Sequence, residues 1–385
     1  MKHLLLLLLC MSLLLCACQA DPQPTAPSTV PTTVPTTVPD TTPSLPETTP
    51  TTVPTVPETE APEETTVPPT EAPVLYTHPL TGLPMEAPLA VRPAAVVINN
   101  TTAAQPLMGV GSADIVFEHI AEGGGTVTRL LAVFTDLENA GTVGSIRSAR
   151  TYLLDLARVF NAPIAHCGYS GYAETYIRTT RYPSFNEFTY GQYYYRDQKR
   201  LDAGYSREHT LMIEGPDLLR GLLEQGFDMT PEPERNYGLE FAETVDLDGA
   251  PANRITMRFF SEYGKSTTMT YDAETGVYYG SQQWNKVQKD FLDGNTGEAV
   301  PFKNVLLLNV MIRWAEDAYH VFTDMTGEGT GYYACNGKYV PIKWYRETAD
   351  DPFTYTYEDG TPLYLAPGKT YVGMLHKNGP AIIVE

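Results

Sequence analysis

The chain has 385 residues, and its 46 acidic and 26 basic side chains give a formal net charge of −20. Fifteen of its 32 prolines lie in residues 21–73, a stretch that holds eight acids and no lysine or arginine and cannot bury a core. Residues 74–385 still carry a net charge of −13, which argues against a non-specific nucleic-acid binder, and these 312 residues are enough for about two domains.

The first 18 residues predict a lipoprotein signal peptide. Lys2 precedes a leucine-rich run from Leu4 to Leu15, which is shorter than the roughly 20 apolar residues of a spanning helix. The run ends in Leu-Cys-Ala-Cys, and Ala17 is small enough to precede a cleavage site, so we expect Cys18 to be acylated. Two acyl chains would anchor the protein to the lipid bilayer, on the outer face of the cytoplasmic membrane. The alternative is a cleaved secretory peptide with a chance cysteine.

Residues 19–75 predict a disordered linker rich in proline and threonine. Its repeated TTVP and ETTP units favour extended polyproline II, which rises about 3.1 Å per residue. At full extension the linker would reach on the order of 160 Å. It could therefore hold the folded part well clear of the bilayer, and spacing is its simplest role.

The next part, residues 76–235, predicts an α+β domain. Residues 92–100 form an apolar run typical of a buried strand, and residues 115–122 and 126–134 flank three glycines as the arms of a hairpin. Alternation along the first arm places Glu118 and Glu122 on one face and His119 on the other.

Helical spacing follows this hairpin. Apolar residues at i, i+3, i+4 and i+7 from Leu153 predict a helix, with Ser145 or Ser148 as its N-cap. A short strand is expected at 163–167. A second helix is expected from Pro216 in its first turn to Gly226 just beyond its end.

Residues 236–385 predict a mostly antiparallel β-rich domain. Short β-rich runs occur at 253–260, 267–271, 305–312, 319–322, 332–335, 339–345 and 354–357. Asn336-Gly337 and Asp359-Gly360 are dipeptides typical of hairpin turns. The fold class expected for the whole is α+β, with a layered N-terminal α/β part and a mostly antiparallel C-terminal part.

Several ordered segments resemble one known family, the YerB-type bacterial lipoproteins. They are HPLTGLP (78–84), RPAAVVINN (92–100), ADIVFEHIAEGGGTVTRLLAVF (113–134), VGSIRSARTYLLDLA (143–157), GTGYYACNGKYVPIKW (329–344) and LAPGKTYV (365–372). The resemblance covers 76–385 and implies a compact layered α+β fold, found mainly in Gram-positive bacteria. It implies no catalytic mechanism, because the family is a domain of unknown function. Cys167 departs from the small residue usual in the family, which argues against a nucleophilic thiol.

Arg147 and Arg150 lead into the first predicted helix. Two guanidinium groups beside the free amides and positive dipole of a helix start are typical of an anion site for a carboxylate, a phosphate or an acidic sugar. The alternative is that both arginines pair with Glu118, Glu122 or Asp155 and hold the fold together.

Histidines and cysteines supply the other candidate groups. His166 with Cys167, or His209 with Glu208, could act as a base with a nucleophile or a carboxylate, although a structural role is the simpler interpretation of each histidine. Cys167 and Cys335 are the only cysteines beyond the signal peptide, so a disulfide framework is excluded and a single bridge stays open.

The sequence predicts no metal site and no cofactor. It contains no HExxH motif, its Asp- and Gly-rich loops lack calcium-loop spacing, and GEGTG (327–331) has no lysine after it for a phosphate loop.

Tyrosine and tryptophan clusters could instead stack on wall sugars or pack strand faces. Their members are Tyr190, Tyr193, Tyr194, Tyr195, Tyr332, Tyr333, Trp344 and Tyr345.

Two functional hypotheses follow. The first is an extracytoplasmic lipoprotein that binds an envelope component, either a peptide, a glycan or a protein, through a polar groove formed by Arg129, Arg147, Arg150, His166 and His209. The second is a cell-wall hydrolase or transferase that uses His166 or His209 as general base, with Glu118 or Glu122 nearby. Because an acidic domain repels anionic wall polymers, any such ligand would have to bind at a local cluster of arginines.

Overall fold

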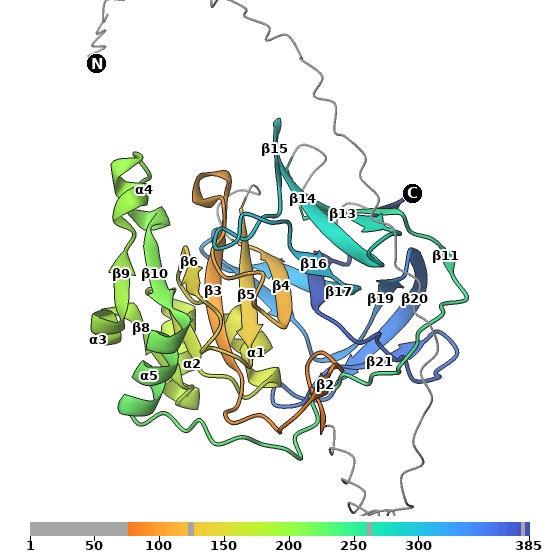
Figure 1. The fold of residues 1–385 in the computed structure, drawn as a ribbon, viewed down its shortest axis with the longest axis horizontal. Helices are drawn as coiled ribbons and strands as arrows, with labels where there is room; N and C mark the ends of the chain where they lie inside the picture. The colour runs from red at the N-terminus through yellow and green to blue at the C-terminus, as the bar shows by residue number, and fades with distance from the viewer. Residues whose placement is uncertain (1–75, 122–126, 260–263, 379–381) are drawn as a thin grey trace, which may run out of the picture. The chain divides into compact units, whose positions relative to one another are not determined.

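A twelve-stranded sheet that mixes parallel and antiparallel pairs forms the centre of the fold (Figure 1). The computed structural model describes residues 76–121, 127–259, 264–378 and 382–385, which belong to one compact unit. The predictions for the signal peptide, the linker, Cys18 and Glu122 therefore lie outside the described residues.

The large sheet runs in the order β11-β20-β19-β17-β22-β4-β5-β3-β7-β8, with β18 beside β17 and β21 beside β20. Its strands are β3 (Ala94–Asn100), β4 (Ile115–Ile120), β5 (Thr128–Phe134), β7 (Ile164–His166), β8 (Ser184–Asn186), β11 (Ala250–Pro251), β17 (Asn304–Trp314), β18 (Val321–Asp324), β19 (Gly327–Cys335), β20 (Lys338–Arg346), β21 (Thr354–Tyr357) and β22 (Thr370–His376).

The large sheet contains both antiparallel and parallel pairs of strands. The predicted hairpin is present, since β4 and β5 pair antiparallel with Glu118 opposite Leu130. β22 lies between β17 and β4 and is parallel to both. β3, β7 and β8 are also parallel to one another. Strands from both predicted domains therefore share one sheet, and the division near residue 235 stays a prediction.

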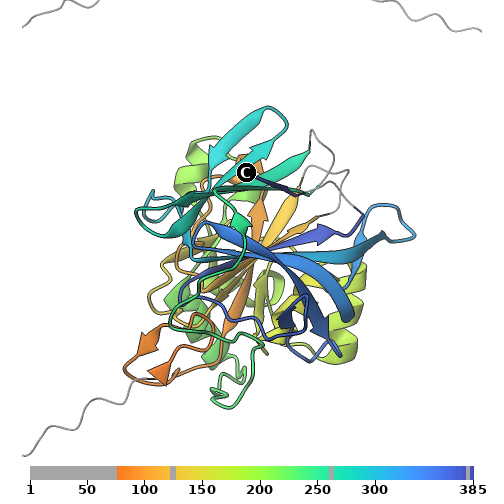
Figure 2. The same ribbon diagram turned by 90° about the vertical axis from the view of Figure 1, so that its right-hand side faces the viewer.

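Three smaller sheets surround the large one. The six-stranded sheet contains β12 (Arg254–Arg258), β13 (Lys265–Asp272), β14 (Val277–Trp284), β15 (Val287–Asp290), β16 (Pro301–Phe302) and β23 (Ile383–Val384). A three-stranded sheet contains β6 (Thr142–Gly144), β9 (Tyr194–Arg196) and β10 (Leu211–Glu214), and β1 (Tyr76–Thr77) pairs with β2 (Pro84–Met85). Figure 2 shows the teal strands of the six-stranded sheet packed above the blue strands of the large sheet.

Short helices complete the N-terminal part, where α3, α4 and α5 gather around β8, β9 and β10 (Figure 1). The helices are α1 (Thr151–Val159), α2 (Gly171–Thr180), α3 (Glu187–Tyr190), α4 (Gln198–Asp202) and α5 (Gly215–Glu224), with 3-10 turns η1 (Thr102–Ala104), η2 (Gly191–Tyr193) and η3 (Arg207–His209). The predicted second helix is confirmed as α5, because Pro216 lies in its first turn and Gly226, at a φ of 72°, follows its end.

The prediction of a serine cap on the first helix is wrong. The N-cap residue of α1 is Arg150, which makes no side-chain capping hydrogen bond. The residues before it are held in extended form, since the amide of Arg147 donates to the carbonyl of Val97 and the amide of Ala149 donates to that of Gly168. Ser145 and Ser148 therefore lie too early in the chain to cap the helix.

Both faces of the central strands are buried, which is why β3, β4 and β5 read as continuous apolar runs. On one face α1 packs against β4, with the rings of Phe117 and Phe160 5.9 Å apart and His119 stacked on Tyr152 at 4.0 Å. On the other face Glu118 meets Lys265 of β13. This layered α+β architecture with a mostly antiparallel C-terminal part confirms the predicted fold class.

None of the helices in the described ranges has the length and apolar character needed to span a bilayer.

Candidate functional site: an arginine groove at the strand ends

The candidate site lies where four similarly directed strands end. β3, β7 and β8 are parallel, and β4 points the same way because both β3 and β4 are antiparallel to β5. Their carboxyl ends therefore meet at one edge of the sheet. In open sheets with parallel strands, ligands usually bind in the crevice outside these carboxyl ends.

Two adjoining depressions occupy this edge, and Arg147 and Glu208 line both of them. Their volumes are about 520 and 450 Å³. We call the pair the arginine groove, which is defined by its charged side chains and the adjacent histidine: Arg129, Arg147, Arg196, Arg207, Glu208 and His209. Among the described residues that line the groove, four are arginines and one is a carboxylate, although residues 74–385 carry a net charge of −13. Arg196 also pairs with Glu187 at 3.8 Å.

Arg147 is positioned by its backbone and lies in the middle of the groove. Its amide donates to Val97 of β3, and its carbonyl accepts from the amide of Cys167 just after β7. Its side chain is about one quarter exposed, and its Nη1 lies 3.1 Å from Oε2 of Glu208. The pair is open to solvent, so a ligand with a negative charge can compete with Glu208 for the guanidinium group.

Arg129 comes from the other side of the sheet edge. It follows Thr128 at the start of β5, and its Nη1 donates to the carbonyl of Ser148 at 2.9 Å. The side chain is largely buried, so the groove wall on this side is held in a fixed position. Two of the predicted groove arginines therefore converge on one site.

His209 is the predicted histidine that reaches the groove. Its Nδ1 lies 2.8 Å from the side-chain nitrogen of Asn99, which can only donate, so Nδ1 is the acceptor. Its Nε2 therefore carries the proton and faces Oε1 of Glu208 at 3.5 Å. Burial lowers the pKa of His209, and nearby arginines add to this effect, against the opposing effect of Glu208. The ring is thus neutral and has no free lone pair for a general base.

His166 does not reach the groove. Its ring has no exposed surface, and its two nitrogens lie 2.8 Å from the carbonyl of Gly168 and 2.6 Å from Oγ of Ser184. Burial lowers its pKa to about 4. His166 is a neutral core residue that holds together the segments after β7 and before β8.

Cys167 forms no dyad with its neighbour His166. Its Sγ donates to a carboxylate oxygen of Glu187 at 3.4 Å, and burial together with that carboxylate raises the pKa of the thiol to about 11. Cys167 and Cys335 are both free thiols, so the bridge left open by the sequence is absent. A protonated thiol is a weak nucleophile, which leaves no Cys/His pair among these residues.

Arg150 does not line either depression of the groove. It caps α1, and its Nη1 donates to the carbonyl of Ala149 at 2.8 Å. Asp155, a predicted partner of the two arginines, instead faces the guanidinium group of Arg346 at 3.7 Å. The expected pair of guanidinium groups beside one helix start is therefore not formed, because Arg147 turns toward Glu208.

Glu118 lies in the core rather than in the groove. Its carboxylate accepts hydrogen bonds from Asn100, Thr128, Thr267 and Tyr371, and Nζ of Lys265 lies 2.9 Å away. Burial would raise its pKa, but the Lys265 ammonium and these donors outweigh burial and hold the pKa below its usual value. Glu118 is thus a paired structural carboxylate, and no ligand can reach it from the groove.

Most of the predicted aromatic clusters pack within the fold. Tyr193, Tyr194, Tyr333 and Trp344 are buried, and Tyr190 stacks on Phe185 at 4.7 Å. The aromatic side chains that line the groove are Tyr169, Phe188 and Tyr319, which are 39%, 73% and 51% exposed.

Arg196 and Arg207 line the groove but were not among the predicted site residues. Arg196 ends the short strand β9, and Arg207 opens η3 within the REHT segment. The proximity of Arg207 to His209 in the sequence was a usable signal, but nothing local links Arg196 to Arg147.

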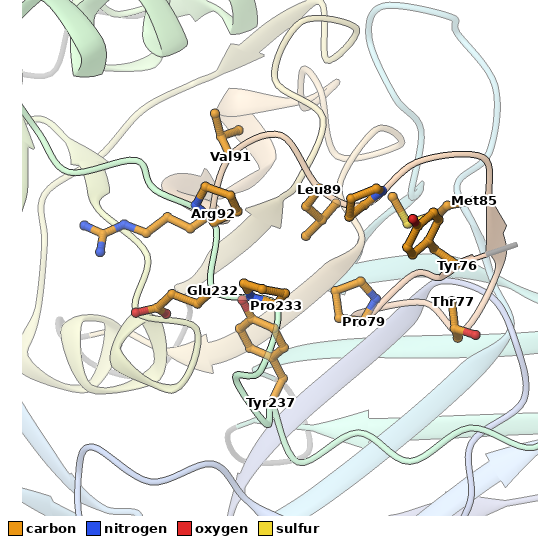
Figure 3. Close-up of a pocket in the computed structure, with 12 residues that line it drawn as sticks. Tyr76, Thr77, Pro79, Met85, Leu89, Val91, Arg92, Glu232, Pro233 and Tyr237 are labelled. Atoms are coloured by element: carbon orange, nitrogen blue, oxygen red, sulfur yellow. The ribbon is translucent and has the colours of Figure 1, made fainter. Parts of the chain in front are cut away.

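A separate apolar cavity of about 270 Å³ lies where the described chain begins (Figure 3). Its walls come from the β1–β2 hairpin and the segment after α5, and include Tyr76, Leu89, Pro233 and Tyr237. Arg92 and Glu232 are the charged residues in its lining, and it shares no lining residue with the arginine groove. Within the described ranges, no group of three His, Cys, Asp or Glu side chains is placed to hold a metal ion.

Two domain families match the sequence. Residues 80–228 match "Protein of unknown function (DUF3048) N-terminal domain", and residues 255–372 match the corresponding C-terminal domain. A relative from Bacillus subtilis (strain 168), named "Putative lipoprotein YerB", is 27% identical over 304 residues, which are 77% of this chain and 85% of the relative. The chain belongs to the YerB-type family. The resemblance seen in the sequence is thus confirmed.

The YerB fold is also found in a solved structure. The crystal structure of YerB protein from Bacillus subtilis matches with a TM-score of 0.66 at 23% identity, and the match covers 80% of this chain and 99% of that one. This likeness supports the fold of the YerB-type family. The arginine groove is argued from the side chains of this chain alone.

Proposed function

We propose that this protein is a membrane-anchored, extracytoplasmic lipoprotein that binds an anionic component of the cell envelope through the arginine groove. The relative named as a lipoprotein supports the anchored location, and the Leu-Cys-Ala-Cys sequence supports Cys18 as the acylated residue. The observation that carries the binding role is the convergence of Arg129, Arg147 and two further arginines on adjoining depressions.

Electrostatics favour an anion as the ligand. The surrounding chain is acidic, so a negative ligand is repelled at long range and attracted only where the arginines outnumber the carboxylates. Guanidinium groups also match carboxylate and phosphate oxygens in a two-pronged geometry that lysine cannot provide. The groove is therefore selective for ligands that carry such groups.

Catalysis has less support than binding. The neutral His209 uses its acceptor nitrogen on Asn99, His166 is enclosed, and the Cys167 thiol is protonated. A hydrolase needs a base or nucleophile within hydrogen-bond reach of its substrate. The groove supplies cationic and aromatic side chains that can hold a ligand in place.

The test is co-sedimentation of the 70–385 fragment, which contains the whole described core, with purified wall sacculi. Sacculi are compared before and after chemical removal of their phosphate-bearing polymers. The proposal predicts retention on untreated sacculi, weaker retention after removal, and no released fragments. Equal retention on both preparations would contradict an anionic ligand, and released fragments would support a hydrolase.

A matched pair of variants links retention to the groove. Arg207→Glu reverses a charge in the groove, whereas Arg178→Glu makes the same change on the exposed far turn of α2. The proposal predicts that only Arg207→Glu loses retention. Equal losses in both variants would mean that overall charge, and no specific site, controls binding.

A further inference from the structure

The arginine groove continues beyond its two depressions. A third depression of about 600 Å³ shares Thr101, Thr102 and Val127 with the one that contains Arg129 and His209. Its far side is formed by Trp284 and Lys286 at the β14–β15 turn. The three hollows follow one another from the start of α3, across the segment after β3, to the β14–β15 hairpin, which lies at the top of Figure 1.

Each of the three depressions is large enough for a small molecule by itself. Sites for small ligands usually have volumes of roughly 300–1,000 Å³, and each of the three depressions falls in that range by itself. A row of such hollows that share walls fits a ligand made of repeated units, with one unit or a few units in each.

Cationic side chains recur along the whole row. Arg196 and Arg207 lie at one end, Arg147 and Arg129 lie in the middle, and Lys286 lies at the other end. A monovalent anion would need only one of these positions. A polymer with a negative charge on each repeat can use several of them at once, and each added contact strengthens the whole.

Aromatic side chains accompany the cations. Phe188 and Tyr169 line the first depression, Tyr319 the second and Trp284 the third. Phe188, Tyr169 and Tyr319 are exposed, whereas Trp284 is buried and has the ammonium group of Lys265 4.8 Å from its ring centroid. The three exposed rings give flat apolar surfaces with polar rims, which suit the faces of sugar or polyol units between charged groups.

The backbone of the groove floor is already paired. The amides of Ile146, Arg147, Ala149 and Cys167 donate to internal carbonyls, and the amide of Gly168 donates to the side chain of Asn186. An extended peptide that bound as an added strand would need free backbone groups. These five amides are therefore not free to pair with an added strand, which favours a ligand held by side chains, such as a polyanionic glycan, over a peptide.

We propose that the three depressions form one continuous groove for a linear polyanion built of sugar or polyol units joined by phosphate groups. This inference rests on the proposed function, since it assigns a ligand class to the same arginine groove. It adds that the ligand is long and that Lys286 on the β14–β15 turn belongs to the site.

The experiment measures the affinity of the 70–385 fragment for glycerol phosphate, a short poly(glycerol phosphate) oligomer and a long one. Affinity should rise by at least about tenfold from the short to the long oligomer, because the long one alone can span all three depressions. Lys286→Glu should weaken the long oligomer about fivefold to tenfold and leave the short one unchanged. Lys289→Glu, an equally exposed charge reversal on β15 outside the groove, is the control and should change neither.

Three results would overturn the inference. Equal affinity for short and long oligomers would leave an anion site without a polymer groove, and the proposed function would survive. Equal effects of Lys286→Glu and Lys289→Glu would remove the third depression from the site. A poly-glutamate chain that bound as tightly as the long oligomer would make the ligand class an acidic peptide. If no anion bound at all, the proposed function itself would fail.

Discussion

Nζ of Lys265 lies 2.9 Å from Oε1 of Glu118, and neither side chain has any exposed surface. Lys265 belongs to β13 of the six-stranded sheet, and Glu118 belongs to β4 in the centre of the large sheet. The ion pair therefore ties the C-terminal part of the chain to the N-terminal part. Hydroxyl groups of Thr128, Thr267 and Tyr371 also donate hydrogen bonds to the Glu118 carboxylate.

Removing the lysine should destabilise the fold strongly. Lys265→Met leaves the Glu118 carboxylate buried without its counter-ion, which we expect to lower the free energy of unfolding by about 3–5 kcal/mol. The double variant Glu118→Gln with Lys265→Met removes both charges and should recover part of that loss. Urea unfolding followed by circular dichroism measures both values. A double variant no more stable than Lys265→Met would refute the pairing.

Acidification should destabilise the protein through His166. Because burial lowers the pKa of this ring to about 4, the unfolded chain binds a proton near pH 6.5 and the folded one does not. The contribution is fully present above pH 6.5, and about 3 kcal/mol is lost as the pH falls toward 4. His166→Gln should flatten the dependence of the unfolding free energy on pH in that window. The same slope in both proteins would show that His166 is accessible and titrates normally.

The thiols should be slow to react in the folded protein. Cys335 is buried, and burial with the Glu187 carboxylate raises the pKa of Cys167 to about 11. Glu187→Gln removes one cause of that rise and should speed alkylation of Cys167 several-fold at pH 8. Rates with iodoacetamide, followed by mass spectrometry, measure this. Rapid alkylation of Cys167 in the unmodified protein would instead indicate an activated nucleophile.

Alanine substitutions at two glycines distinguish the energetic cost of backbone strain from that of steric overlap. Gly238 and Gly226 have nearly the same positive φ, but a Cβ atom on Gly238 would lie 1.9 Å from the carbonyl oxygen of Phe353, whereas one on Gly226 meets open space. Gly226→Ala should cost about 1 kcal/mol of stability, and Gly238→Ala about 3 kcal/mol or more. Thermal unfolding of the two variants gives the comparison. Equal costs would mean that residues 236–238 can move away from β21 without penalty.

Local patterns in the sequence predict much of the fold. The three glycines between apolar runs predict the β4–β5 hairpin, and Pro216 and Gly226 bound α5 because their effects act within a turn. Long-range pairing leaves no such local signal. The insertion of β22 between β4 and β17 depends on contacts across more than half of the described chain, and the serine cap failed because Gly168 holds Ala149 in extended form.

The candidate site was likewise predicted only in part, because local patterns are visible in the sequence and long-range contacts are not. Arg147 was predicted from its position before a helix, and Arg129 and His209 were named with it in the predicted groove. His166 and Glu118 have the same residue types, but the fold places them in the core with partners that lie 18 and 147 residues further along the chain, Ser184 and Lys265. Arg196 was missed because a three-residue strand carries too little pattern to show where its side chains point.

Binding of a polyanion by the arginine groove is tested most directly at Arg147, because this residue lines two depressions. Arg147→Ala should change thermal stability little, since its partly exposed pair with Glu208 is worth less than about 1 kcal/mol. It should weaken binding of the long poly(glycerol phosphate) oligomer at least tenfold and lower the slope of log affinity against log salt by about one, while the Arg178→Ala control keeps both values. Unchanged affinity and slope in Arg147→Ala would contradict the claim.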